Sequence, residues 1–304
     1  MTLIEQLKQI HDPRCQRGQR HALWLILLLS LLGSLCGYWG YRPLAAFSHK
    51  HHQHWCNLLE LPDTTPVPSY STFRRVFQRL DAAVWVEVFN QWAMRHAPDL
   101  AGRVLAIDGK SIRCTSTGGH STMQDFVSLV SVYGHADEGV VQLQLMHNKQ
   151  VSEIEVAKHL IQHLPTATGA SCLTLDALHA QTETVKLLHQ QHQDFVIGLK
   201  PNQLTLYRTA EELHRHATAL SVATETEQRH GRSVQPFAWV YAAPAHLQSK
   251  WQGLKTRVWV ERQGRRNQQP FQQQHCYLSS YALDATEFLR RIRRHWHIEN
   301  WVVF

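Results

Sequence analysis

The feature that most constrains the fold is an alternation of short apolar runs with helix-like stretches, which begins at Arg103. Short apolar runs bounded by polar turns are typical of strands, and their alternation with amphipathic stretches is typical of an α/β domain. The predicted strands are Val104–Asp108, Phe126–Tyr133, Val140–His147, Ser171–Asp176 and Asp194–Leu199, and the predicted helices are Ser152–Leu164 and Gln181–Gln191.

The order of these elements is three strands, then helix, strand, helix and strand. Three successive strands form an antiparallel meander, whereas strands joined through a helix lie parallel by right-handed crossovers. The order therefore favours a ribonuclease H-like mixed sheet, in which the first and fourth strands are neighbours.

Residues 1–100 are predicted to be helical, with Pro43 placed to start a helix at Leu44 and a proline-rich loop at residues 61–68. After the loop, Ser69 or Ser71 can cap a helix. Its apolar face and its cationic face follow helical spacing, with Phe73, Val76, Phe77 and Leu80 on the first and Arg74, Arg75 and Arg79 on the second. A second helix is predicted at residues 82–96, with Trp85, Val88, Phe89 and Trp92 turned inward. We expect a helical, DNA-binding N-terminal domain at residues 1–100 and an α/β domain at residues 101–304.

The last third of the chain is predicted to hold a β-rich insertion at about residues 203–281, followed by a long helix. The β-like pieces are Phe237–Tyr241, Thr256–Glu261 and His275–Ser279. In the helix, Asp284–Asn300, one stripe carries Phe288, Ile292, His295 and Glu299, while Arg290, Arg291, Arg293 and Arg294 lie mostly elsewhere.

Charge and cysteine content limit the partners and the compartment. The net charge is +7, and residues 250–304 carry ten Lys and Arg against four Asp and Glu, a difference of +6. A basic segment suits a polyanion such as nucleic acid, although a solvated basic face is the alternative. The six cysteines contain no CxxC pair, which disfavours a zinc ribbon or a disulfide scaffold and fits a reducing cytoplasm.

One apolar run, residues 22–35, raises the question of a membrane segment. It is shorter than the roughly 20 residues that a span needs, and no convincing cleavage site of a signal peptide follows it. We expect a buried helix here and no membrane association, with a membrane anchor as the alternative.

Three carboxylates are candidates for chemistry, although each has an ordinary structural interpretation. Asp108 stands in an Asp-Gly pair that could be a hairpin turn, Asp176 could cap a helix, and Glu299 could be a solvated helix residue. In a ribonuclease H-like sheet, however, the first and fourth strands would end beside the final helix and bring all three together. Such a cluster suits Mg²⁺, and two ions roughly 3.5 to 4 Å apart can stabilise both the attacking and the leaving oxygen of a phosphodiester.

Several segments together resemble the H-repeat-associated family of insertion-sequence transposases, of the DDE superfamily, over nearly the whole chain. They are HDPRCQRGQRH, PSYSTFRRVFQRLD, RVLAIDGKSIR, LTLDALHAQTETV, DFVIGLKPNQLTLY and IRRHWHIEN. The resemblance implies that Asp108, Asp176 and Glu299 form the DDE triad and bind two Mg²⁺ or Mn²⁺ ions. It implies strand cleavage followed by attack of a freed 3′-hydroxyl on target DNA. The implied partners are the element's terminal inverted repeats, target DNA and a second copy in a homodimer, and the implied location is the bacterial cytoplasm, at the nucleoid when DNA is bound.

Further residues are candidates for holding DNA. Besides the three arginines of the N-terminal helix they are Lys110, Arg113, Lys200, Asn202, Gln203, Arg293 and His295. Related transposases carry an Arg four positions and a Tyr seven positions before the glutamate, where this chain has His295 and Ile292.

The chain ends five residues after Glu299, where members of the family continue. From this we expect a C-terminal truncation that leaves the transposase weak or inactive. Two alternatives stay open: a catalytically dead DNA-binding remnant, and a ribonuclease H-like, metal-dependent nuclease that hydrolyses DNA without joining it.

Overall fold

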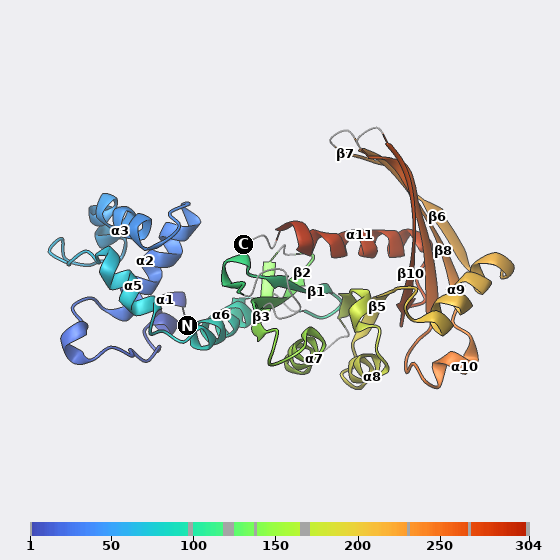
Figure 1. Ribbon diagram of the computed structural model, residues 1–304, viewed down its shortest axis with the longest axis horizontal. Coiled ribbons are helices and arrows are strands. Elements are labelled where there is room, and N and C mark those ends of the chain that lie inside the picture. The colour runs from blue at the N-terminus through green and yellow to red at the C-terminus, as the bar shows by residue number, and fades with distance from the viewer. Residues whose placement is uncertain are drawn as a thin grey trace. The chain divides into compact units, whose positions relative to one another are not determined.

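The computed structural model describes residues 2–96, 100–117, 125–136, 139–164, 171–229, 232–266 and 269–301. The chain forms two compact units, Met1–His96 and Ala97–Phe304. Helices make up the first unit, and a large mixed sheet dominates the second (Figure 1).

The helical unit is built around one apolar helix. Its helices are α1 (Leu3–Leu7), α2 (Leu23–Leu35), α3 (Tyr41–Lys50), α4 (His52–Leu58), α5 (Tyr70–Phe77) and α6 (Ala82–His96). In α2, Leu25 to Leu29 are buried in the core of the unit, which confirms the predicted buried helix. By length and composition, Gln16–Leu35 is the one segment among the described residues that could cross a membrane, and half of its most apolar stretch is buried.

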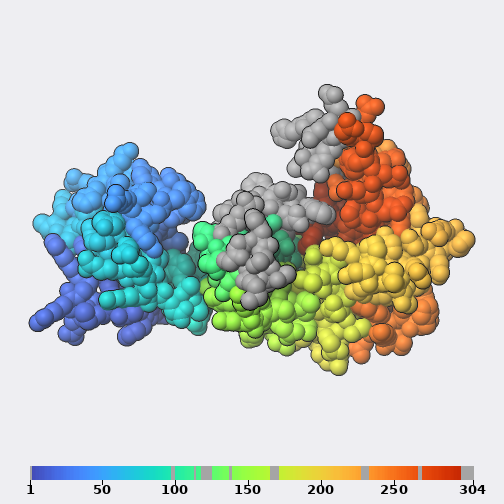
Figure 2. Space-filling view, in the orientation of Figure 1, coloured from blue at the N-terminus to red at the C-terminus, as the bar shows by residue number. Residues whose placement is uncertain are grey.

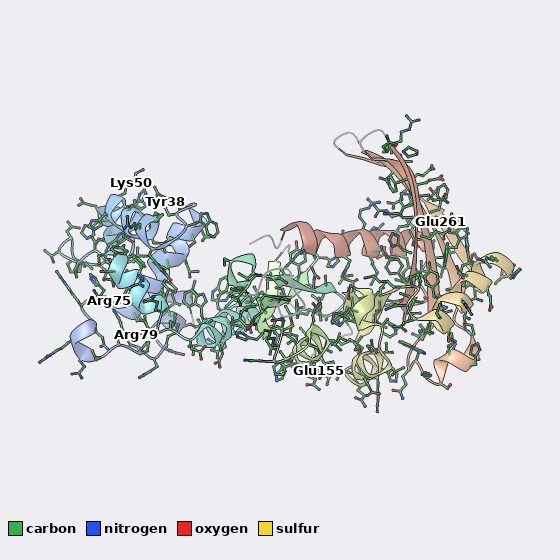
Figure 3. The ribbon with its side chains drawn as sticks, in the orientation of Figure 1. Tyr38, Lys50, Arg75, Arg79, Glu155 and Glu261 are labelled. Atoms are coloured by element: carbon green, nitrogen blue, oxygen red, sulfur yellow. The ribbon has the colours of Figure 1, made fainter. Side chains whose placement is uncertain are left out.

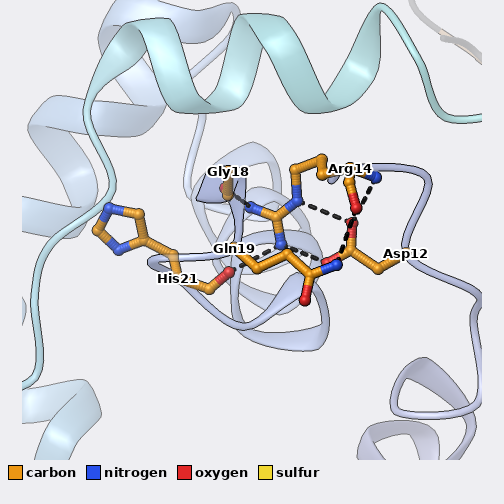
Figure 4. Close-up of polar contacts among 5 residues, drawn as sticks. All are labelled: Asp12, Arg14, Gly18, Gln19 and His21. Atoms are coloured by element: carbon orange, nitrogen blue, oxygen red, sulfur yellow. Dashed lines mark hydrogen bonds and ion pairs between the residues drawn. The ribbon is translucent and has the colours of Figure 1, made fainter. Parts of the chain in front are cut away.

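The loop between α1 and α2 is ordered by one arginine (Figure 4). Arg14 is buried and donates Nε to Asp12 Oδ1 at 2.8 Å and Nη2 to Asp12 Oδ2 at 2.7 Å. The same side chain donates to the carbonyl oxygens of His21 at 2.8 Å and Gly18 at 3.3 Å. These hydrogen bonds lower the pKa of Asp12 below its ordinary value. Two-point pairing of this kind needs the planar guanidinium.

Helix α5 has the two faces that its sequence predicts. Ser69 is the N-cap and accepts from the amide of Thr72, while Phe73 and Val76 are buried. The three arginines Arg74, Arg75 and Arg79 are exposed; the first two belong to α5 and Arg79 follows its C-cap, Gln78. Figure 3 labels Arg75 and Arg79. Helix α3, by contrast, begins at Tyr41 rather than at Leu44, because Pro43 fits within a first turn that needs no amide from it.

Helix α6 has the predicted bounds but is less buried than predicted. Of its residues, Ala93 is buried, and Val84, Trp85 and Val88 are partly buried against the core. Phe89 and Trp92 are half-buried and pack on each other, with their ring centroids 6.2 Å apart.

The central sheet has the predicted order of elements. The strands β1 (Val104–Ser111), β2 (Val127–Gly134) and β3 (Gly139–His147) form an antiparallel meander. After α7 (Glu153–His163), strand β4 (Cys172–Leu175) pairs parallel with β1, and after α8 (Thr182–Gln190), strand β5 (Asp194–Leu199) pairs parallel with β4. The first and fourth strands are therefore neighbours, as predicted.

The β-rich segment continues the same sheet. Its elements are α9 (Leu204–His216), β6 (Ser221–Thr224), β7 (Glu227–Arg229), β8 (Arg232–Ala242), α10 (Ala245–Gln248), β9 (Thr256–Arg266) and β10 (Gln269–Ser279). Strand β10 pairs antiparallel with β5. The described residues thus form one sheet of ten strands in the order β3-β2-β1-β4-β5-β10-β9-β8-β6, with β7 on β8. In the space-filling view, the surface runs without a break from α7 and α8 to this segment (Figure 2).

Helix α11 (Ala285–Trp301) and helices α7 and α8 cover opposite faces of the sheet (Figure 1). On the α11 face, Phe288, Leu289 and Ile292 pack against strand residues that include Cys172 and Val196. The opposite face buries the larger core, in which α7 and α8 cover β1, β4 and β5. The predicted apolar stripe of the last helix is thus confirmed as far as Ile292.

Candidate active site

Asp108 and Asp176 stand beside each other in the sheet. In the parallel pairing of β1 and β4, Ile107 is opposite Leu175. Asp108 and Asp176 are the next residues after this pair, one on each side. Neighbouring strands lie about 4.8 Å apart. Asp108 does not lie in a hairpin turn, because β1 continues to Ser111 and residue 108 pairs with Ser131 of β2. The hairpin interpretation of the Asp-Gly pair is therefore wrong.

Local contacts orient each aspartate. Lys110 Nζ lies 3.7 Å from Asp108 Oδ2, and the Asp108 side chain is 21% exposed. Asp176 is the N-cap of the 3₁₀ turn η3 (Ala177–His179), and its Oδ1 accepts the amide of Leu178 at 2.9 Å. The capping role considered for Asp176 is thus real, and it fixes one oxygen while leaving Oδ2 for another partner.

Helix α11 is tied to the strand that carries Asp176. His295 Nδ1 lies 3.0 Å from Thr174 Oγ1, which itself donates to the Leu105 carbonyl at 3.2 Å. Because that hydroxyl has one proton, the His295 nitrogen must be the donor of the shared hydrogen bond. Burial lowers the pKa of His295 to about 4, so the ring is neutral at physiological pH.

Glu299 lies four positions after His295 in the same helix, and hence one turn further along it. The side chains of residues 296–301 are outside the part of the chain that the structure describes. The structure therefore brings together the two aspartates and the helix that carries the glutamate.

A pocket of about 210 Å³ opens beside Asp176. Its lining residues come from β4, β5, β10 and α11 and include Asp176, Gly198, Lys200, His275, Tyr277 and His295. Gly198 allows β5 to lie close to the turn after Asp176, since a Cβ there would lie 3.2 Å from the amide nitrogen of Ala177. Space for a ligand group thus exists next to the carboxylate.

The other predicted DNA-contacting residues have different surroundings. Lys200 is exposed at the pocket, and Asn202 is exposed after it. Gln203 donates to the Ala180 carbonyl and so supports the turn after Asp176. Arg293 is ion-paired with Glu225, and the side chain of Arg113 is outside the described residues.

Several of the positive side chains in residues 250–304 contact other groups of the protein. Arg257 is buried and donates to the Leu206 carbonyl at 2.8 Å, and Arg291 lies over the Tyr281 ring. Arg290 and Arg291 both pair with Glu287. The exposed cationic surface is therefore smaller than the count of charges suggests.

Cysteine nucleophiles are disfavoured in the sheet. Cys172 and Cys276 are buried, and burial raises the pKa of each thiol to about 12. Since the thiolate is the reactive form, neither residue is a nucleophile at neutral pH.

Sequence reasoning missed the residues that surround the aspartates. His179 of η3 lies between Glu153 of α7 and Asp176, with its Nε2 3.5 Å from Glu153 Oε1 and 3.9 Å from Asp176 Oδ1. Buried His135 lies beside Thr174, 3.5 Å from Nε2 to Oγ1. The only local signal was Ser152, which caps α7 and so fixes Glu153 in the first turn.

The donor set suits a hard divalent cation. Asp108 and Asp176 supply carboxylate oxygens, which Mg²⁺ prefers, and the pocket gives access to Asp176. Within the described residues, no group of three His, Cys, Asp or Glu side chains is close enough to hold a metal ion. A metal site at the two aspartates would thus need a further ligand, either from a side chain outside the described residues or from the substrate.

Fold and site together define a mixed α/β domain with a carboxylate pair on its central parallel strands, preceded by a helical unit. The chain belongs to the transposase DDE domain family, whose sequence pattern matches residues 99–301, and the DDE_Tnp_1-associated pattern matches residues 4–93. The chain is 26% identical to the "H repeat-associated putative transposase YhhI" of Escherichia coli K12, over 98% of this chain and 80% of that protein. It is 25% identical to "Putative transposase YncI" of Escherichia coli O157:H7, over 99% of this chain and 79% of that protein. These matches confirm the resemblance drawn from the sequence.

Proposed function

We propose that this transposase cleaves and transfers DNA strands with divalent metal ions held by Asp108, Asp176 and Glu299. The observation that carries the proposal is the parallel register of β1 and β4, which puts the two aspartates side by side under the helix of Glu299. Two Mg²⁺ or Mn²⁺ ions would supply charge stabilisation at the attacking and leaving oxygens.

The fold supports this proposal through its topology. An antiparallel meander followed by two parallel strands, with a helix packed against β1 and β4, is the arrangement expected of a ribonuclease H-like domain. We infer that residues 101–304 form the catalytic domain and that the segment at about 203–281 is its β-rich insertion.

The protein's own groups would do the remaining work. Lys110 lies at Asp108 and Lys200 at the pocket beside Asp176, so both can hold a phosphate oxygen near the carboxylates. The helical unit, residues 1–100, would bind DNA through Arg74, Arg75 and Arg79, and the active form would be a homodimer on the element's terminal repeats.

A strand-cleavage assay tests the function. Duplexes that carry the DNA flanking the gene are incubated with the full chain and Mg²⁺, with EDTA and Asp108→Asn as controls. Mg²⁺-dependent nicking that is lost in the variant supports the proposal, and product analysis separates joining to a second duplex from hydrolysis alone. Salt-sensitive binding without cleavage under any metal would favour a DNA-binding remnant instead.

A further inference from the structure

His179 lies between two carboxylates behind the proposed metal site. Its side chain is 1% exposed, and Nε2 is 3.5 Å from Glu153 Oε1 and 3.9 Å from Asp176 Oδ1. Neither ring nitrogen has a hydrogen-bond partner in the part of the chain that the structure describes. Buried polar atoms without partners are rare in folded proteins, and those that occur call for an explanation.

Glu153 reaches this histidine because residue 109 is a glycine. A Cβ at position 109 would lie 2.6 Å from Glu153 Oε2 and 2.7 Å from its Cδ. Gly109 follows Asp108 within β1, so the Glu153 carboxylate rests against the backbone next to the first aspartate. Gly109 thus does not form a turn; it leaves space for the Glu153 carboxylate.

The backbone of Glu153 is held in place by the start of helix α7. Ser152 caps α7 by accepting the amide of Glu155 at 3.3 Å, which puts Glu153 in the first turn. An acidic side chain there also interacts favourably with the helix dipole.

The surroundings of His179 indicate a donor and not a metal ligand. In the tautomer that carries its N–H on Nε2, the nitrogen that faces the two carboxylates can donate to them and has no lone pair for a cation. His179 Nε2 and the Leu178 amide both approach Oδ1 of Asp176, which leaves Oδ2 for a cation.

We propose that Glu153 and His179 are positioning residues that hold Asp176 in its metal-binding orientation, and that Gly109 makes room for them. The inference rests on the proposed function, because it assigns Asp176 a metal. Glu153 orients the His179 ring, and the ring orients the Asp176 carboxylate, as outer hydrogen-bonding groups do around metal ligands in general.

Mn²⁺ titration by calorimetry on the full chain tests the proposal separately from DNA cleavage. We expect His179→Ala and Glu153→Gln each to weaken Mn²⁺ binding on the order of 10-fold or more. His179→Gln keeps an N–H near the Nε2 position and should recover most of the affinity, whereas His179→Met keeps the volume and should not. Gly109→Ala should act like Glu153→Gln, because the added methyl displaces only the flexible end of Glu153.

A matched control lies two residues further along the same helix. Glu155 is exposed and pairs with Lys158 at 3.0 Å, and Figure 3 labels it at α7. Glu155→Gln should bind Mn²⁺ as the unchanged chain does.

The outcomes separate the two proposals. If the unchanged chain binds no Mn²⁺, the metal-dependent function itself fails. If it binds Mn²⁺ and His179→Met binds equally well, His179 only fills space and the positioning role is overturned. Equal binding by Glu153→Gln and Glu155→Gln would overturn the role of Glu153. Thermal unfolding of each variant shows whether a loss of affinity reflects a loss of fold.

Discussion

His295 of α11 and Thr174 of β4 are joined by a hydrogen bond of 3.0 Å. Thr174 stands two residues before Asp176, and His295 stands four before Glu299, so this bond fixes the last helix relative to the strand that carries the second aspartate. The hydroxyl also donates to the Leu105 carbonyl of β1, at 3.2 Å. One side chain therefore links the three elements that bear the proposed triad.

Thr174→Val should destabilise the chain by about 1–3 kcal/mol, because it removes the hydroxyl's hydrogen bonds with Leu105, His295 and His135 and leaves the half-buried His295 donor unpaired. Urea denaturation measures the loss. Thr184→Val is the matched control, since the buried Thr184 hydroxyl has no hydrogen-bond partner among the described residues and its removal should cost nothing. Equal losses in the two variants would show that the Thr174 contacts do not stabilise the fold.

Acid should weaken the fold in part through His295. Its pKa falls from an ordinary 6.5 to about 4 in the folded chain, so the unfolded chain binds the proton first. The neutral His295 ring therefore contributes to the free energy of unfolding above pH 6.5. This contribution is lost as the pH falls toward 4, by up to about 3 kcal/mol. His295→Gln should therefore lose less stability than the unchanged chain between pH 7 and pH 4.5 in urea melts. An identical pH dependence would contradict the burial of this ring.

Arg14→Lys should destabilise the helical unit by about 2 kcal/mol, because lysine keeps the charge but cannot pair with both oxygens of Asp12. Circular dichroism during thermal unfolding follows the helices. Arg17, in the same loop, is exposed, and Arg17→Lys should leave the midpoint unchanged. A midpoint that is the same in both variants would rule out the Arg14 contacts as the support of this loop.

The arginines on α5 and just after it should contribute charge to DNA binding. Replacing Arg74, Arg75 and Arg79 by Gln should lower the slope of log K against log salt by roughly 3, since each phosphate contact contributes about 0.9. Fluorescence anisotropy with a labelled duplex at several salt concentrations gives the slope. Replacing the exposed residues Arg208, Arg215 and Lys250 by Gln removes the same charge elsewhere and should change the slope less. Equal changes would show that α5 is not a preferred contact.

The order and pairing of the central strands could be predicted from the sequence, because burial on both faces leaves continuous apolar runs in β4 and β5. Strand ends were harder to predict. Strand β1 continues past Asp108 because Gly109 and Lys110 still pair with β2, a contact that no local pattern encodes. Likewise, β9 and β10 extend into Gln- and Arg-rich sequence because each pairs along its whole length with a neighbour.

The surroundings of the site could not be predicted for the same reason. Glu153 and His179 are ordinary polar residues in the sequence, and only the packing of α7 against β1 and η3 brings them together. Helix α9 was also missed, although Leu206 and Ala210 are spaced four apart and both are buried against the sheet. The segment at about residues 203–281, predicted to be β-rich, therefore begins with a helix.

Ferrous-iron affinity cleavage tests most directly whether Asp108 and Asp176 hold a divalent cation together. Iron bound in place of Mg²⁺, with ascorbate and peroxide, generates radicals that cut the nearby backbone, and mass spectrometry locates the cuts. If the proposed triad holds the ion, cuts should appear near residues 108, 176 and 299; excess Mg²⁺ should suppress them, and Asp108→Asn and Asp176→Asn should each abolish them. Cuts at the histidine-rich segment 49–54 would persist in both variants and serve as an internal control. Two results would contradict a shared cation site at Asp108 and Asp176. One is cleavage near these residues that is unchanged in both variants, and the other is its absence from the unchanged chain while the control cuts appear.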